Sequence, residues 1–279
     1  MKMNEFLNQN RWRFIDQSIS FLQRSPLESF AMDDTLCHIV GQGMSAPTVR
    51  TWVHENSVVL GIQDHRLPFV KEGIEWLESN DYKAIVRNSG GLAVVLDTGV
   101  LNISLVLSEN EQSISINNGY EAMVDLIKLL FPEVADQIEA YEIVGSYCPG
   151  SYDLSIGGKK FAGISQRRMR QGIAVQIYLC IEGSGSARAE LIRKFYQISL
   201  KDEKTKFAYP KINPEVMASL SELMDRKLTV YDTVLRLQNV LQLTGEMKLQ
   251  ALNDNETEYY TVYMNRVLER NKKMLMLEK

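Results

Sequence analysis

Residues 146–168 read SYCPGSYDLSIGGKKFAGISQRR, and this stretch decides both the local fold and the chemistry that we expect. Residues 151–156 alternate in the manner of a β-strand, and Gly157-Gly158 is a two-residue turn signal typical of a hairpin. The return strand then brings Lys160 back toward the loop that carries Cys148. A cation beside a thiol stabilises the nucleophilic thiolate and lowers the thiol pKa from about 8.5. The pattern predicts a reactive thiol–ammonium pair, with a surface hairpin that merely carries both groups as the alternative.

Length, composition and charge narrow the class of protein. The chain has 279 residues, 45% of them hydrophobic and 24% charged, with a net charge of -4. These values are ordinary for a globular protein, and nothing in the charge balance favours nucleic acid. No apolar run approaches the ~18 residues that cross a membrane, and the N-terminus has no apolar signal core. Three cysteines without metal-type spacing fit a reducing, cytoplasmic setting, in which a thiol is free to react.

Strand and helix patterns interleave irregularly through about residue 200, and only helical patterns follow from Asn213. We expect strands at 12–19, 50–53, 58–62, 84–87, 100–107 and 173–181, and helices at 29–40, 70–80, 119–131, 187–195, 214–223, 230–243 and 256–277. This order predicts an α+β fold, with a catalytic domain over 1–205 and a C-terminal helical extension over 206–279 packed on it. Cys37 falls on the apolar face of a helix and Cys180 lies inside a strand, so both are expected to be buried.

Several other kinds of catalytic site lack support. All three histidines, at positions 38, 54 and 65, precede Cys148, so the Cys-then-His order of papain-like proteases is absent. An earlier histidine that folds back beside the thiol remains open. Asp33 and Asp34 are adjacent and point to different faces of a helix, which disfavours a paired-carboxylate site. No two cysteines or histidines sit at ligand spacing, so we expect neither a metal nor a cofactor.

Three stretches together resemble the biotin/lipoate protein ligase and octanoyltransferase superfamily. Residues 87–94, RNSGGLAV, are similar to its R-(R/N)-S-G-G-x-A-V strand and turn. Residues 153–163, DLSIGGKKFAG, are similar to its D-L-x-(I/V)-x-G-K-K-(I/F)-A-G hairpin, and residues 30–36, FAMDDTL, to its N-M-A-x-D-E-x-L helix. The match covers roughly residues 28–200. It implies a mixed, largely antiparallel sheet flanked by helices, plus a C-terminal helical segment.

Two departures indicate the branch of the superfamily. Leu96 stands where ATP-using lipoate ligases carry a histidine, and those ligases lack a cysteine corresponding to Cys148. The chain looks most like the lipoate/octanoate amidotransferase branch, which acts in protein lipoylation without ATP. Its members move an octanoyl (or lipoyl) group from a lysine of the glycine cleavage H protein to a lysine on lipoyl domains of 2-oxoacid dehydrogenase complexes. The resemblance implies that Cys148 is the acyl-thioester nucleophile and that Lys160 lowers its pKa.

An eight-carbon acyl chain needs an apolar slot, because each buried CH₂ contributes about 0.8 kcal/mol. Small and aliphatic residues on the two matching motifs are the expected walls of that slot: Gly90, Gly91, Leu92, Ala162 and Gly163. Backbone N–H groups beside Cys148 or at Ala162-Gly163 are candidates for an oxyanion hole.

Four rival interpretations stay open. The nearest is an octanoyltransferase that draws on octanoyl acyl carrier protein and uses the same thioester chemistry. An ATP-dependent lipoate ligase, a non-catalytic module that binds lipoyl domains, and a cysteine hydrolase are the others.

Overall fold

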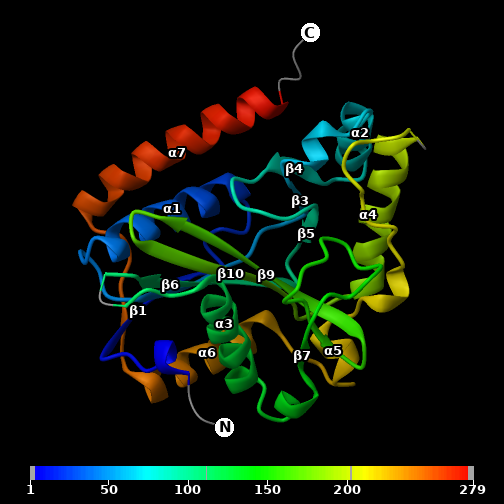
Figure 1. Cartoon of the computed structure of the whole chain (residues 1–279). Helices are drawn as coiled ribbons and strands as arrows, with labels where there is room; N and C mark the ends of the chain where they lie inside the picture. The colour runs from blue at the N-terminus through cyan, green and yellow to red at the C-terminus, as the bar shows by residue number, and fades with distance from the viewer. Residues whose placement is uncertain (1–3, 111, 202, 276–279) are drawn as a thin grey trace.

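The computed structural model describes residues 4–110, 112–201 and 203–275, and Figure 1 shows the arrangement of their helices and strands. The elements in chain order are η1 Glu5–Leu7, β1 Arg11–Gln17, α1 Pro26–Gly41, β2 Thr48–Trp52, β3 Ser57–Leu60, η2 Asp64–Arg66, α2 Val70–Ser79, β4 Lys83–Val86, β5 Val94–Leu96, β6 Val100–Ser108, α3 Ile116–Leu130, η3 Ala135–Gln137, β7 Glu139–Ala140, β8 Leu154–Ile156, β9 Lys159–Met169, β10 Gly172–Cys180, α4 Gly185–Leu200, η4 Pro214–Val216, α5 Leu220–Leu223, α6 Val230–Thr244, β11 Glu246–Leu249 and α7 Asp254–Leu275. The α+β class that the sequence predicts is confirmed.

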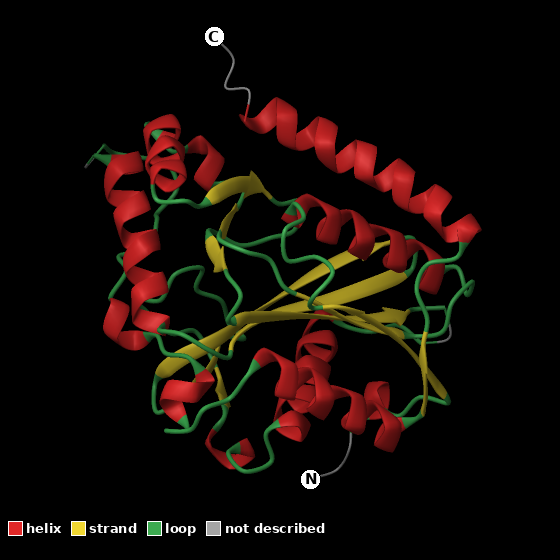
Figure 2. Ribbon diagram, turned by 180° about the vertical axis from the view of Figure 1, so that it is seen from behind, coloured by secondary structure: helices red, strands yellow, loops and turns green. Residues whose placement is uncertain are grey.

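The larger sheet has eight strands in the order β11-β1-β2-β6-β10-β9-β8-β7. β1 runs parallel to both β2 and β11, whereas the other neighbours are antiparallel, so the sheet is mixed and largely antiparallel as expected. β6 and β10 pair along their full lengths, from Gly172 opposite Ser108 to Cys180 opposite Val100. Helices cover both faces: α1, with α7 outside it, lies on one face, and α3 and α6 lie on the other (Figures 1 and 2).

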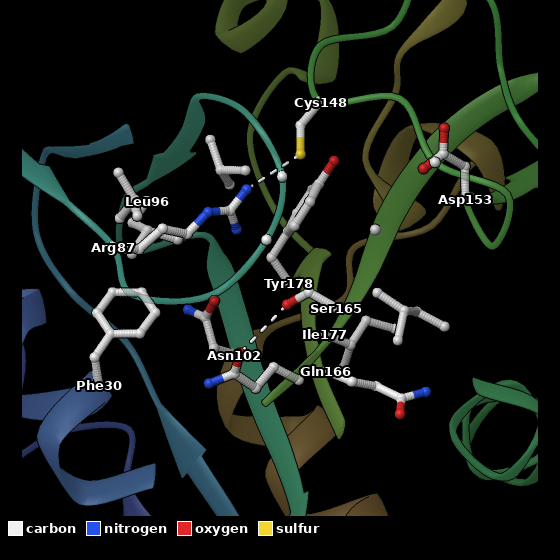
Figure 3. Close-up of a pocket in the computed structure, with 18 of the residues that line it drawn as sticks. Phe30, Arg87, Leu96, Asn102, Cys148, Asp153, Ser165, Gln166, Ile177 and Tyr178 are labelled. Carbon is white, nitrogen blue, oxygen red and sulfur yellow. Dashed lines mark hydrogen bonds between the residues drawn. The ribbon is translucent and has the colours of Figure 1, made fainter. Parts of the chain in front are cut away.

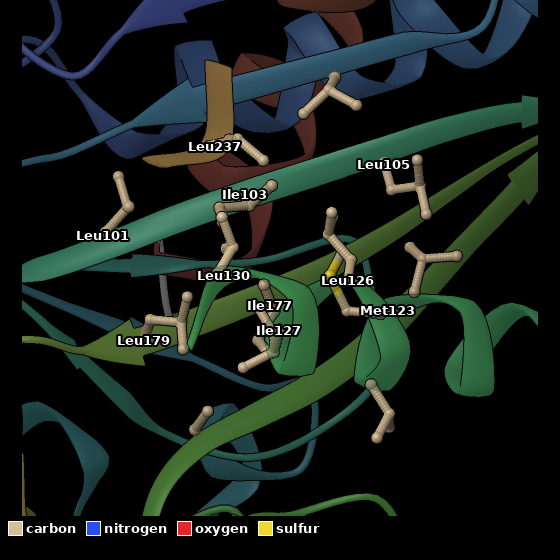
Figure 4. Packing of buried hydrophobic residues seen from close by; sticks show 14 of the residues in the cluster. Leu101, Ile103, Leu105, Met123, Leu126, Ile127, Leu130, Ile177, Leu179 and Leu237 are labelled. Carbon is tan, nitrogen blue, oxygen red and sulfur yellow. The ribbon is translucent and has the colours of Figure 1, made fainter. Parts of the chain in front are cut away.

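The core beneath α3 follows from the period-2 pattern of β6. Leu101, Ile103 and Leu105 project to one face of the strand, and each is fully buried. They meet a stripe of buried residues on α3 at helical spacing, which comprises Met123, Leu126, Ile127 and Leu130 (Figure 4). Ser115 caps this helix by accepting a hydrogen bond from the Asn118 N–H, as N-terminal serines commonly do. α3 thus packs on one face of the long strands at the centre of the sheet.

The smaller sheet has three strands in the order β4-β3-β5. β2 and β3 lie in different sheets, although residues 53–56 join them directly. α2 and α4 pack beside the small sheet, and Leu77 and Phe195 are fully buried there. The turn that links β4 to β5 packs on the end of β3, because a Cβ at Gly61 would lie 1.9 Å from the Gly91 carbonyl oxygen. This contact holds the glycine turn against the end of β3.

The C-terminal part of the chain packs on both faces of the large sheet. α6 supplies buried Leu237 and Leu241 to the core beneath the sheet, and α7 packs along α1. The expectation of helices alone after Asn213 was wrong, because residues 246–249 form β11 beside β1. Their sequence EMKL alternates polar and apolar residues as a short strand does, and the four residues pair with the edge of β1. The division at residue 205 stays a prediction. Across the described residues, no helix has the length and hydropathy that crossing a membrane requires.

Candidate active site

A cavity of about 270 Å³ lies between the two sheets, below the loop that carries Cys148 (Figure 3). Its apolar walls come from α1, from both sheets and from the turn after β4. They include Phe30, Trp52, Val59, Val94, Leu96, Ile164 and Ile177. A few polar side chains, among them Asn102, Ser165 and Gln176, line the inner part. The size is near the lower end of small-ligand sites, which begin at about 300 Å³, and suits one slender apolar group.

The predicted hairpin is present. Gly157 and Gly158 form its turn with φ values of +56° and +74°, the left-handed conformation that glycine adopts readily. β8 and β9 pair antiparallel on either side, with Ser155 opposite Lys160. Lys160 therefore reaches the Cys148 loop, and its Nζ donates to the Cys148 carbonyl oxygen at 2.8 Å. The main chain of Lys160 is also held, since its carbonyl accepts a hydrogen bond from the Ala218 N–H at 3.0 Å.

The Lys160 ammonium is fully buried and has a carboxylate partner of its own. Its Nζ lies 2.8 Å from Asp153 Oδ1 and donates to the Tyr147 carbonyl oxygen at 3.0 Å. Burial raises the pKa of the Asp153 carboxyl, and the Lys160 ammonium opposes that rise. Lys160 Nζ also donates to Ser146 Oγ at 3.3 Å, so its hydrogen bonds end on a carboxylate, a hydroxyl and the backbone of the loop. None of them ends on the sulfur.

Two other groups contact the sulfur. Cys148 Sγ accepts from Arg87 Nη2 at 3.3 Å (Figure 3). It also accepts from the Leu92 N–H at 3.2 Å. Cys148 has a φ of +45°, a strained conformation for a non-glycine residue of the kind that concentrates at functional sites. Sequence reasoning missed Arg87 as a contact of the thiol. The available signal was its place as the first residue of the RNSGG stretch.

The glycine turn after β4 permits this contact. Gly91 has a φ of +103°, and a Cβ there would lie 2.1 Å from Arg87 Nη2 and 3.0 Å from Cys148 Sγ. A Cβ at Gly90 would meet nothing within 4 Å. Glycine is required at the second position because the guanidinium and the sulfur meet directly beside it.

Of the five residues predicted to line an acyl slot, three line the cavity and two are buried outside its lining. Gly90, Gly91 and Gly163 line the cavity. The Leu92 side chain is buried outside the cavity lining, while its N–H donates to the sulfur. Ala162 is fully buried in the core that includes α3.

The three histidines lie away from the sulfur, and none lines the cavity. His54 Nε2 lies 2.9 Å from Ser29 Oγ, and burial lowers its pKa to about 4. His38 contacts the Tyr263 hydroxyl at 3.0 Å. The histidine that the sequence left open as a neighbour of the thiol is therefore not found in this cavity.

The two adjacent aspartates turn to different partners, as expected. Asp33 forms a fully buried ion pair with Arg50 at 2.7 Å. Asp34 pairs with Arg167 at 2.7 Å and accepts from Asn88 Nδ2 at 2.9 Å, which ties α1 to the glycine turn. Within 4–110, 112–201 and 203–275, no three histidine, cysteine or acidic side chains gather as metal ligands would. Cys37 and Cys180 are buried, as predicted.

Comparisons with known proteins agree with this architecture. Residues 25–242 match the model of the lipoyl protein ligase A/B catalytic domain. The chain belongs to the family of proteins that carry this domain. A bipartite lipoate protein ligase from Thermoplasma acidophilum has the same fold, with a TM-score of 0.63 at 16% identity over 96% of this chain and 98% of that one. A lipoate-protein ligase A solved with ATP gives a TM-score of 0.68 at 16% identity, over 92% and 95% of the two chains.

Full-length relatives place the chain in one branch of that family, the octanoyl-[GcvH]:protein N-octanoyltransferases. One protein of that name, from Lysinibacillus sphaericus, is 69% identical over 98% of this chain and 99% of its own length. A second, from Geobacillus kaustophilus, is 55% identical over 98% and 96% of the two chains. A lipoyl-[GcvH]:protein N-lipoyltransferase from Listeria monocytogenes is 52% identical over 98% of each. The chain is therefore an acyltransferase.

Proposed function

We propose that this protein moves an octanoyl group from a lysine of the glycine cleavage H protein to a lysine on lipoyl domains of 2-oxoacid dehydrogenase complexes. Cys148 carries the acyl group between the two. One observation supports the assignment most. The Cys148 thiol, whose sulfur accepts two hydrogen bonds, lines a largely apolar cavity whose volume suits a slender acyl chain. The names of the relatives support GcvH as the donor. The reducing cytoplasm, in which a thiol stays free, is the proposed compartment.

The reaction divides into two acyl transfers. In the first, the Cys148 thiolate attacks the amide carbonyl of the donor's octanoyl-lysine, so a C–S bond forms and the C–N bond breaks. The donor amine leaves and takes up one proton. In the second, the acceptor lysine attacks the thioester as a free amine, so a new C–N bond forms, the C–S bond breaks, and the amine gives up one proton. One amide replaces another, and the exchange therefore needs no ATP.

The predicted roles of the site residues belong to this proposal. Cys148 is the nucleophile, and the Lys160 ammonium favours its thiolate through space while bonding the carbonyl of the same residue. Gly90, Gly91 and Gly163 leave room for the acyl chain, and the side chains of Leu92 and Ala162 are buried outside the lining of the cavity.

A second acyl group has support of its own. The relative from Listeria monocytogenes is named for lipoyl transfer, although it is about as similar to this chain as several octanoyl-named relatives are. Lipoyl and octanoyl groups share an eight-carbon backbone. We propose the octanoyl group as the principal substrate and the lipoyl group as a second one for the same cavity.

The direct test is to detect the intermediate by intact-protein mass spectrometry. Incubation with octanoylated H protein and no ATP is expected to add one octanoyl group to the wild-type chain. The adduct and the transfer to a lipoyl domain are both expected to vanish in Cys148→Ala and Cys148→Ser, with the fold unchanged by circular dichroism. Transfer that survives in Cys148→Ala would contradict the mechanism. A parallel incubation with octanoyl acyl carrier protein separates the two donors, since labelling by that donor alone would favour the rival octanoyltransferase.

A further inference from the structure

Arg87 is a buried cation for which the described part of the chain supplies no carboxylate partner. Its side chain is 7% exposed, and Nη2 donates to Cys148 Sγ and, at 2.7 Å, to the Leu92 carbonyl oxygen. Among the residues that the structure describes, Arg87 takes part in no ion pair, and its Nε finds no hydrogen-bond partner. A buried charge is costly unless an opposite charge compensates it. The environment of Arg87 therefore lacks an anion in direct contact.

The other titratable groups around the thiol do not supply that anion. Asp153 is committed to Lys160 at 2.8 Å. Asp64 accepts from the Tyr196 hydroxyl and the Gly61 N–H, each at 2.7 Å, and acts on Arg87 only through space. Tyr178 and Tyr196 face the thiol, but burial raises both pKa values well above the usual range, so their hydroxyls stay neutral. Among the described residues, Cys148 is the titratable group in direct contact with the Arg87 guanidinium.

We propose that Arg87 is the direct counter-ion of the Cys148 thiolate and, with the Leu92 N–H, forms the anion site of the reaction. Arginine suits this role because its guanidinium is always charged and is more weakly hydrated than an ammonium. Lys160 then holds the loop that presents the sulfur, whereas Arg87 holds the sulfur itself. Arg87 Nη2 and the Leu92 N–H are both within hydrogen-bond distance of the reacting sulfur, which makes Arg87 a catalytic residue.

The same pair of donors has a second use during transfer. When the sulfur is acylated it loses its negative charge, and the acyl oxygen lies one bond beyond the carbon attached to it. Arg87 Nη2 and the Leu92 N–H can then turn to that oxygen, where charge develops as each amine leaves or attacks. This part of the inference rests on the proposed function. The thiolate assignment does not need it.

The test measures the thiol without any acyl substrate. The rate of iodoacetamide alkylation of Cys148, read by peptide mass spectrometry, is followed from pH 5 to 10 in the full chain. Arg87→Gln and Arg87→Met are expected to move the midpoint upward by about 1 pH unit, which lowers the rate near neutrality about tenfold. Arg87→Lys is expected to shift it less. Arg66→Gln is the matched control, because Arg66 is an exposed arginine whose contact is Gln63, and its midpoint is expected to equal that of wild type.

The outcomes distinguish this inference from the proposed function. Arg87→Met removes a buried charge that has no carboxylate partner, so the variant is expected to fold and keeps the test available if Arg87→Gln does not. An unchanged midpoint in folded Arg87→Met would overturn the assignment, even if octanoyl transfer through Cys148 is found. An upward shift in a protein that never acquires an octanoyl group would support the anion site and contradict the proposed function.

Discussion

Two buried cations approach Cys148 from opposite sheets, and they are held in different ways. Lys160 comes from β9 of the large sheet and is paired with Asp153 at 2.8 Å. Arg87 follows β4 of the small sheet and contacts the sulfur at 3.3 Å. A paired cation contributes mainly to structure, because its charge is already compensated, while an unpaired one favours whatever anion forms beside it. The difference predicts that replacing Lys160 lowers the stability of the fold, whereas replacing Arg87 lowers the reactivity of the Cys148 thiol.

The largest effect is expected for the paired cation. Lys160→Met leaves the Asp153 carboxyl buried without its partner, so the free energy of unfolding is expected to fall by about 3–5 kcal/mol. Urea denaturation followed by circular dichroism measures this loss. The double variant Lys160→Met with Asp153→Leu removes both charges and is expected to recover most of the stability, as Arg87→Met is expected to retain it. Equal stability of Lys160→Met and wild type would remove the distinction between the two cations.

The contact between Arg87 and the sulfur can be disturbed without changing either residue. Gly91→Ala places a Cβ 2.1 Å from Arg87 Nη2 at a φ of +103°, so the guanidinium has to move. The alkylation rate of Cys148 at pH 7 is expected to fall about tenfold, with a loss of about 1–2 kcal/mol of stability from the strained backbone.

Gly90→Ala is the matched control for this change, since a Cβ there would meet nothing within 4 Å. Its alkylation rate is expected to stay close to that of wild type. Parallel losses in both variants would show that any side chain in the turn is harmful, whatever its distance from Arg87.

Asp64 provides a pH-dependent test of the environment of Arg87. Burial raises its pKa from 3.8 to about 6, so the folded protein holds a proton that the unfolded chain releases between these values. The stability that this proton contributes is present below pH 4 and is lost as the pH rises through 6. Between pH 4.5 and 7 the loss amounts to about 2 kcal/mol.

Asp64→Asn is expected to remove that loss, so the variant gains stability relative to wild type as the pH rises. Urea unfolding at pH 4.5 and 7.0 measures the change. The contributions of all other titratable groups to the free energy of unfolding cancel when the variant is compared with wild type. A constant difference between variant and wild type at both pH values would mean that Asp64 is ionised throughout. Arg87 would then have a permanent anion nearby.

Local patterns account for most of what could be predicted. The paired glycines at 157 and 158 define the hairpin because a two-residue loop of that kind leaves little choice of register. That register places Lys160 opposite Ser155 and so returns it toward the segment that carries Cys148. By contrast, β11 escaped prediction because its polar–apolar alternation is only four residues long and lies between two longer helical patterns.

The sequence by itself determined the hairpin that carries Lys160, the class of fold and the resemblance to lipoyl-transferring proteins, since each depends on residues close together in the chain or on a recognisable order of motifs. Only the tertiary structure decided which cation meets the sulfur. Arg87 and Cys148 are 61 positions apart and belong to connections of different sheets. Their contact depends on how the two sheets pack, and on a turn in which glycine leaves space for a guanidinium to reach a thiol. Periodicity and turn chemistry do not encode such a distance.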